Sequence, residues 1–194
     1  MKPFIKHLFL VIAFASFIAS FGQEKAEVMK YPTDWRYERI NFPLDFAKDI
    51  SWEGFEELRF SPGMFDIKSS DYFTYYFVLS IKNRLELSQK EIQEALAKYY
   101  RGLCKAVNPK GKFDINYDEI TVTIHKLSSC SLKANVVFFD GFTDGRRIEL
   151  EMLLEVRKNE SEDILLLASV APTGNTKKLE TLHQNNLEYN LSNR

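Results

Sequence analysis

Residues 88–103, SQKEIQEALAKYYRGL, have the pattern of an amphipathic helix. Ser88 and Glu91 have the spacing of a capping box, in which a hydroxyl and a carboxylate each satisfy a free backbone amide at a helix start. Apolar residues then recur at the three- and four-residue spacing that places them on one helical face. These residues are Ile92, Ala95, Leu96, Tyr99, Tyr100 and Leu103. Asn108-Pro109 ends the helix, because the residue before a proline disfavours helical backbone.

Four strands are predicted after this helix, over residues 119–127, 132–140, 146–157 and 163–171. The third alternates, with apolar side chains at every second position from Ile148 to Val156 and charged ones at 147, 149, 151, 155 and 157. Such alternation predicts one buried and one solvated sheet face. Asp144-Gly145 favours a tight hairpin, and consecutive strands joined by short turns usually pair antiparallel.

Aromatic residues are concentrated before the helix, between Tyr31 and Phe77. Strands are predicted there over residues 35–42 and 55–60. A third strand, over 72–81, is apolar on both faces and is expected to be covered on both sides. Ser61-Pro62-Gly63 is a turn, since proline presets its backbone angle and glycine accepts a positive φ.

These elements predict an α+β fold, in which one long amphipathic helix packs across an antiparallel β-sheet. The order of the elements is similar to cystatin-like and hot-dog folds, a likeness that concerns shape alone. We expect a single domain over residues 31–172, a flexible leader over 23–30 and a polar C-terminal tail over 173–194. Within the tail, 179–187 could form a short helix.

The first 22 residues have the pattern of a secretory signal peptide. Lys2 and Lys6 precede an uninterrupted apolar run at Leu8–Ala15, and a small residue stands before Gln23. The apolar segment is short for a membrane span and ends abruptly in polar residues. We expect cleavage near Gly22-Gln23, a mature chain without a membrane span, and a periplasmic or extracellular location.

Charge and cysteine content narrow the possible partners. The formal net charge is −1 for the whole chain, and loss of two lysines with the leader makes the mature chain more acidic. Nucleic acid is therefore not an expected partner, because no basic cluster is present to contact phosphates. Cys104 and Cys130 could form a disulfide in an exported protein, although both positions also suit small buried side chains.

No metal site, cofactor or catalytic set is predicted. The histidines of the mature chain, His125 and His183, are far apart, and the cysteines lack the spacing of a zinc motif. Serines near His125 do not have the Gly-x-Ser-x-Gly arrangement of a hydrolase nucleophile. Glu149 and Glu151 point the same way along one strand, at a spacing that overlaps that of glycosidase carboxylates, but cross-strand charge pairing explains them equally well.

Two regions are candidates for binding. The first is the aromatic segment, where rings such as Trp35, Trp52 and Tyr76 could stack on a sugar or line a cleft. The second is the solvated sheet face with Thr121, Thr123, His125, Glu149 and Glu151. Candidate binding residues in the aromatic segment are Glu56, Glu57, Arg59, Tyr72 and Tyr75.

A resemblance rests on FPLDFAKDI at 42–50, WEGFEELRFSPGMF at 52–65 and YFTYYF at 72–77. Together these segments resemble an uncharacterised family of exported bacterial proteins of Bacteroidetes type. The resemblance implies a bacterial source and an envelope or extracellular setting. It implies no activity, cofactor or catalytic residue.

Three functions are compatible with these features. The first is an exported, non-enzymatic domain that binds a protein, a glycan or another ligand. The second is a hydrolase of envelope or dietary polymers, which requires two carboxylates that converge in a concave pocket. The third is a carrier of a small apolar ligand, which requires a cavity between helix and sheet.

Overall fold

The computed structural model describes residues 27–159, 161–174 and 176–191. Its strands are β1 (Arg36–Asn41), β2 (Gly54–Phe60), β3 (Tyr75–Ile81), β4 (Thr121–Lys126), β5 (Ser131–Phe139), β6 (Arg147–Lys158) and β7 (Ile164–Pro172). The α-helices are α1 (Gln89–Val107) and α2 (Thr176–Leu191), and short 3-10 turns lie at Pro109–Gly111 and Tyr117–Glu119. The signal peptide expected at residues 1–22 lies outside the described residues.

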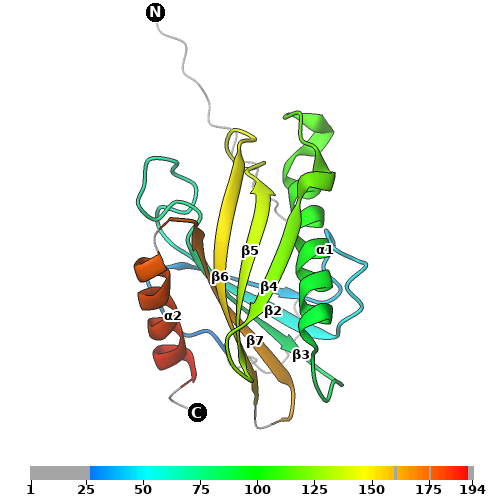
Figure 1. The fold of residues 1–194 in the computed structure, drawn as a ribbon, viewed down its shortest axis with the longest axis vertical. Helices are drawn as coiled ribbons and strands as arrows, with labels where there is room; N and C mark the ends of the chain where they lie inside the picture. The colour runs from blue at the N-terminus through cyan, green and yellow to red at the C-terminus, as the bar shows by residue number, and fades with distance from the viewer. Residues whose placement is uncertain (1–26, 160, 175, 192–194) are drawn as a thin grey trace, which may run out of the picture.

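All seven strands form one antiparallel sheet in the order β1-β2-β3-β7-β6-β5-β4 (Figure 1). The sequential pairing predicted for β4 to β7 is confirmed. The last strand, β7, lies in the middle of the sheet and pairs with β3, so that Tyr75 faces Val170. This pairing joins two sequential blocks, β1-β2-β3 and β4-β5-β6-β7, into a single α+β fold.

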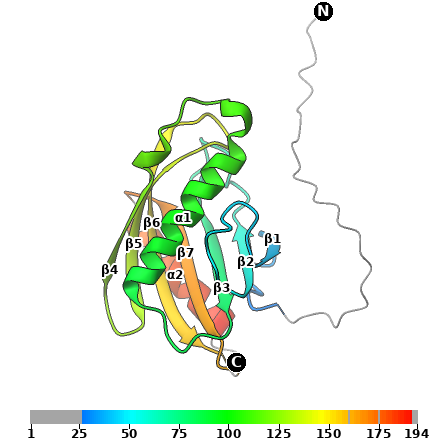
Figure 2. The same cartoon turned by 90° about the vertical axis from the view of Figure 1, so that its right-hand side faces the viewer.

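Helix α1 packs across one face of the sheet, as its sequence predicts (Figure 2). The Ser88–Glu91 capping box is present, and the predicted apolar face is buried in the main core. The helix continues through Gly102 to Asn108. A Cβ at Gly102 would lie 2.0 Å from the Phe46 carbonyl oxygen, so a glycine allows the 42–53 loop to approach the helix closely.

The alternation predicted for β6 is also present. Ile148, Leu150, Met152 and Leu154 are buried toward α1, while Glu149 is exposed on the other face. Glu155 is an exception, because it is buried on the solvated side. It accepts a hydrogen bond of 2.5 Å from the Ser131 hydroxyl and pairs with Arg157 at 2.6 Å, which compensates for its loss of solvent.

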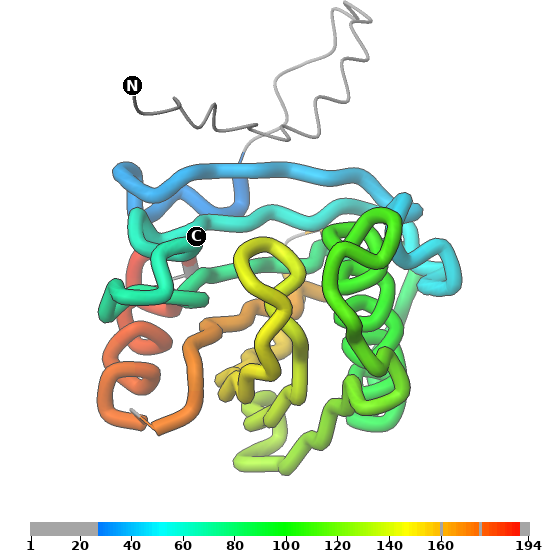
Figure 3. Tube along the Cα trace, turned by 90° about the horizontal axis from the view of Figure 1, so that it is seen from above, coloured from blue at the N-terminus to red at the C-terminus, as the bar shows by residue number. Residues whose placement is uncertain are grey.

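The expectation of one helix and a polar tail was incomplete. Helix α2 covers the opposite face of the sheet from α1, beside β7 and β6 (Figure 3). Leu179, Asn186 and Asn190 are buried on its contacting side. Asn186 donates to the Ala168 carbonyl and to the Ser169 hydroxyl. The two asparagines are therefore buried because they form hydrogen bonds, not because they are apolar. The pattern of apolar residues alone therefore underestimates this helix.

Two other expectations need correction, and the open alternative for the two cysteines is decided. Strand β3 begins at Tyr75 rather than Tyr72, because Phe73 has a positive φ of 48° within a turn. Residues 27–30 of the expected flexible leader are fixed to the sheet, with Val28 and Met29 buried. Cys104 and Cys130 are free thiols, so the considered disulfide is not formed. Cys104 instead donates to the Phe139 carbonyl in the core.

Two apolar clusters lie on the two faces of the sheet. The main core is formed by α1, the 42–53 loop and the inner face of the strands. A smaller cluster on the outer face contains Val28, Met29, Tyr76, Val78, Leu165 and Leu167. In the part of the chain that the structure describes, none of the helices has the length and apolar character needed to cross a bilayer.

Candidate functional site

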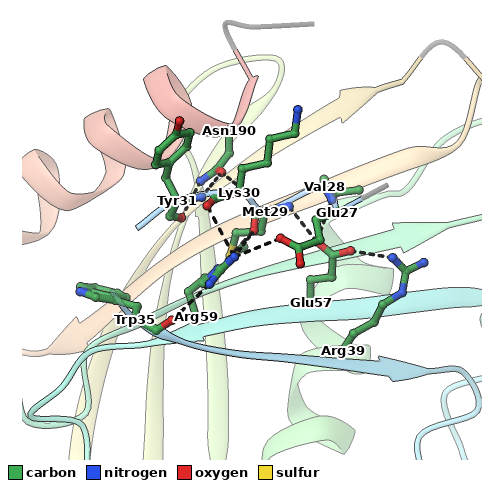
Figure 4. Close-up of polar contacts among 10 residues, drawn as sticks. All are labelled: Glu27, Val28, Met29, Lys30, Tyr31, Trp35, Arg39, Glu57, Arg59 and Asn190. Atoms are coloured by element: carbon green, nitrogen blue, oxygen red, sulfur yellow. Dashed lines mark hydrogen bonds and ion pairs between the residues drawn. The ribbon is translucent and has the colours of Figure 1, made fainter. Parts of the chain in front are cut away.

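The outer face of β1, β2 and β3 holds the N-terminal segment through buried side chains (Figure 4). We call residues 27–31 the strap. Glu57 is fully buried, and one of its carboxylate oxygens accepts hydrogen bonds from the Val28 and Met29 amides at 2.8 and 2.7 Å. Its other oxygen pairs with Arg39 at 2.8 Å. Glu57 thus serves as a charged acceptor for strap backbone, a strong type of hydrogen bond.

Arg59 lies beside Glu57 on the same face of β2 and satisfies strap carbonyls. Its guanidinium donates to the Met29 carbonyl at 3.2 Å and to the Trp35 carbonyl at 3.2 Å, and it pairs with Glu27 at 3.1 Å. It also lies 4.6 Å from the centre of the Tyr37 ring. Burial, followed by the negative charges of Glu57 and Glu27, raises the pKa of Tyr37 to about 12.

Asn190, near the end of α2, holds the other end of the strap. Its side-chain oxygen accepts from the Lys30 amide at 2.8 Å and from the Tyr31 amide at 3.0 Å. Its side-chain nitrogen donates to the Tyr31 carbonyl and to the Asn186 oxygen. These four bonds use both donors and both acceptor positions of the amide. Hydrogen bonds of Asn190 therefore join the strap to α2, two segments that are far apart in the sequence.

A pocket of about 280 Å³ opens between the end of the strap and α2. One wall is formed by residues 31–35, and the other by Leu182, Asn185, Tyr189 and Asn190. Tyr76 of β3 contributes its ring, and its hydroxyl donates to the Leu182 carbonyl at 2.9 Å. The contacts of Glu57, Arg59 and Asn190 thus fix the backbone that forms one wall.

Aromatic rings dominate the lining of this pocket. The rings of Trp35 and Tyr76 stack with centroids 4.7 Å apart and planes 29° apart. Tyr31 and Tyr189 meet across the two walls at 5.6 Å, with planes 44° apart. Of the aromatic residues considered from the sequence, Trp35 and Tyr76 lie at this pocket, where Tyr76 is buried. Tyr72 and Tyr75 are elsewhere.

Glu56 lies on the opposite face of β2 from Glu57, inside the main core. It is fully buried, and neither carboxyl oxygen accepts a hydrogen bond of normal geometry. Burial raises its pKa to about 8; the Tyr99 hydroxyl lowers the pKa and the charge of Glu38 raises it. Glu56 is therefore a neutral acid at pH 7 and does not line the pocket.

The two tyrosines of the candidate set have structural partners. Tyr72 donates to Asp140 at 2.6 Å and thereby ties the loop before β3 to the β5–β6 turn. Burial, followed by this contact with Asp140, raises the pKa of Tyr72. The Tyr75 hydroxyl contacts the Tyr100 hydroxyl beneath α1. Burial is the largest cause that raises the pKa of Tyr75.

His125, Glu149 and Glu151 are on the outer face of the second strand block. His125 is exposed on the edge strand β4, opposite Lys133. Glu149 pairs with Arg147 at 2.7 Å, and Glu151 pairs with Lys133 at 2.9 Å. Each carboxylate thus has a basic partner. The Glu151–Lys133 pair joins β6 to β5, as cross-strand pairing predicts, whereas Glu149 and Arg147 belong to the same strand. Neither carboxylate lines the pocket.

A second pocket, of about 120 Å³, lies near the start of α1. It is lined by Trp52, the 49–51 segment and charged residues that include Arg84 and Glu91, which pair at 3.2 Å. Neither of these two pockets lies between α1 and the sheet. Among the described residues, no group of three or more histidines, cysteines or carboxylates could hold a metal ion.

The structure therefore brings together only part of the candidate set, Glu57 and Arg59. Sequence analysis missed Tyr31, Asp34, Asn185, Tyr189 and Asn190, which complete the pocket or fix its walls. Tyr31 belongs to the aromatic segment and could have been included on that ground. The α2 residues had no signal of their own, because their role depends on the position of the helix.

Comparisons of the chain with protein-family models, with curated proteins and with solved structures find no match.

Proposed function

We propose that the chain is an exported, non-enzymatic binding domain that holds a small ligand in the pocket between the strap and α2. The pocket with its aromatic lining and fixed walls is the observation that carries this proposal. The pattern of residues 1–22 and the family resemblance support export to the periplasm or the cell exterior in a bacterium. The packing of α1 across one face of the sheet supports a cystatin-like or hot-dog-like arrangement, which is part of the same proposal.

The rigidity of the walls supports a binding role. A site whose backbone is already fixed loses less conformational entropy when a ligand binds. Glu57 and Asn190 hold consecutive strap amides, and Arg59 holds the Trp35 carbonyl. The backbone on both sides of the Tyr31-Pro32 bond is thereby fixed before any ligand arrives.

The size and chemistry of the pocket favour a small molecule over a polymer. A volume of about 280 Å³ is at the lower end of ligand pockets, close to that of a small metabolite. A hydrolase of the expected type needs a desolvated carboxyl in such a pocket. Among the described lining residues the one carboxyl group belongs to Asp34, which is exposed, and Glu56 is on the other face of the sheet.

The proposal is tested by ligand-observed NMR with a defined panel of small molecules and the complete domain. The panel contains choline, 3,3-dimethyl-1-butanol, D-glucose, N-acetylglucosamine and indole. At least one compound is expected to bind the native protein and to lose binding in Tyr189→Ala. The Tyr189 side chain is 48% exposed, so its removal leaves the core intact.

Phe142→Ala provides the matched control. Phe142 is also a surface aromatic residue, 38% exposed, but it lies beside Phe65 and away from the pocket. Binding should survive this substitution, and circular dichroism should be native for both variants. The proposed function is wrong if no compound binds, or if binding is equally insensitive to both substitutions.

A further inference from the structure

The pocket has a charge and a lining that select one class of small molecule. Resting on the proposed function, we propose that its ligand is a small organic cation with a quaternary or alkylated ammonium group. Two observations carry this assignment: the sign of the lining charge and the aromatic rings of the lining.

Asp34 gives the pocket a negative charge. It is exposed at the rim, and among the described lining residues no lysine, arginine or histidine balances it. Arg59 lies behind the wall, where it donates to the Trp35 carbonyl and pairs with Glu27. An anionic ligand would therefore meet a carboxylate without a cation in the lining, whereas a cationic ligand would meet a complementary charge.

Aromatic rings from both walls line the same small volume. Tyr76 is buried and stacks on Trp35, so the rings available to a ligand are those of Trp35, Tyr31 and Tyr189. Tyr31 and Tyr189 lie 5.6 Å apart across the two walls. The electron-rich faces of tryptophan and tyrosine attract cations, and groups of such rings recognise quaternary ammonium ligands.

Two hydrogen-bonding side chains of the lining are used by the protein itself. Asn190 makes four bonds with the strap and with Asn186, which uses its full capacity. The Tyr76 hydroxyl donates to the Leu182 carbonyl. The exposed side chains of Thr33, Asp34 and Asn185 stay available to a ligand, so the charge and the aromatic rings carry the assignment.

Choline and 3,3-dimethyl-1-butanol test the assignment, because they have nearly the same shape and differ in charge. Trp35 reports binding by fluorescence in a Trp52→Phe background, since the chain contains two tryptophans and Trp52 lies outside this pocket. Choline is expected to bind about tenfold more tightly than the neutral alcohol at constant ionic strength. D-glucose is expected not to bind.

Substitutions separate charge from shape. Asp34→Asn should weaken choline binding several-fold and leave binding of the neutral alcohol unchanged, whereas Tyr189→Ala should weaken both. Asp118→Asn is the matched control, because it removes an exposed carboxylate from the 3-10 turn at Tyr117–Glu119, outside the pocket. It should leave both affinities unchanged.

Each alternative outcome overturns a defined part of the argument. Equal affinity for choline and the neutral alcohol would overturn the cation assignment in favour of a simple apolar site. Binding of D-glucose but not choline would overturn it in favour of a sugar. Both results would leave the proposed binding function in place if Tyr189→Ala abolished the signal. Absence of binding by every compound would overturn the cation assignment and the proposed function together.

Discussion

Two neighbouring glutamates show how strongly the environment of a single residue determines its chemistry. Glu56 and Glu57 are adjacent on β2, so their side chains lie on opposite faces of the sheet. Glu57 accepts two amides and pairs with Arg39, whereas Glu56 is buried without a hydrogen bond of normal geometry. The environment of Glu56 favours its neutral form.

Glu56→Gln should therefore alter the pH dependence of stability. The pKa of Glu56 is about 8 in the folded protein, against an ordinary value of 4.5. As pH rises between these values, the unfolded chain loses the proton while the folded chain keeps it, so native stability falls. Relative to the native protein, Glu56→Gln should gain on the order of a few kcal/mol in free energy of unfolding between pH 5 and pH 9. Urea unfolding at the two pH values measures this change.

Glu57→Gln is the control one residue away. The oxygen of a glutamine could still accept both strap amides, but its nitrogen would then face Arg39 and the ion pair would be lost, so this substitution should destabilise the protein by about 2 kcal/mol at both pH values. If Glu56→Gln and the native protein respond identically to pH, then Glu56 is not a neutral buried acid.

The sequence could identify these residues but not their partners. Glu56, Glu57 and Arg59 stand out in the sequence because they are charged residues within an aromatic segment. The actual partners are Arg39 for Glu57 and Glu27 for Arg59. Each partner belongs to a segment whose position depends on strand pairing or on the strap, and residue spacing carries no information about either.

At the scale of elements, the sequence predicts the helices and strands that pack through apolar contacts. Helix α1 and strand β6 have clear periodicity because the core contacts them with apolar atoms. Helix α2 packs through Leu179 but also through Asn186 and Asn190, whose burial depends on hydrogen bonds. A polar residue on the contacting face is indistinguishable in sequence from one on the solvated face.

Asn190→Ala should release the strap from α2. The substitution removes four hydrogen bonds and leaves two strap amides without their acceptor, so stability should fall by about 1–3 kcal/mol. Hydrogen exchange of the Lys30 and Tyr31 amides should accelerate. Asn185→Ala, at an exposed position of the same helix, should change neither quantity. Unchanged exchange in Asn190→Ala would contradict the role assigned to this residue.

At the scale of the whole molecule, the two faces of the sheet are unequally supported. The core beneath α1 includes residues from every strand except β1, together with the 42–53 loop. The cluster beneath α2 and the strap is much smaller. Layers with few buried apolar contacts open at lower free energy than the global core.

The two tryptophans allow this inequality to be measured, because Trp35 is on the smaller side and Trp52 is in the main core. In Trp52→Phe, the fluorescence change of Trp35 should precede the loss of circular dichroism as urea increases. In Trp35→Phe, the fluorescence change of Trp52 should coincide with the loss of circular dichroism. Coincident transitions in both variants would mean that the two layers unfold as one unit.

The overall topology was only partly predictable. Short polar turns indicate the pairing of β4 to β7 because they restrict where the next strand can lie. The pairing of β3 with β7 has no such local cause, since a helix and three other strands separate them in the chain. Two sequential blocks could be inferred, but not the single sheet that they form.

The central position of β7 also restricts the order of events during synthesis. A nascent chain that has not yet released residues 164–172 lacks the strand that separates β3 from β6, so its two blocks have no common hydrogen-bonded neighbour. The single sheet can close only after residues 164–172 are available, because β7 is the neighbour that β3 and β6 share. Contacts so distant along the chain form slowly. Until β7 is in place, β3 and β6 each have an unpaired edge, the kind of edge at which strands of different chains can pair.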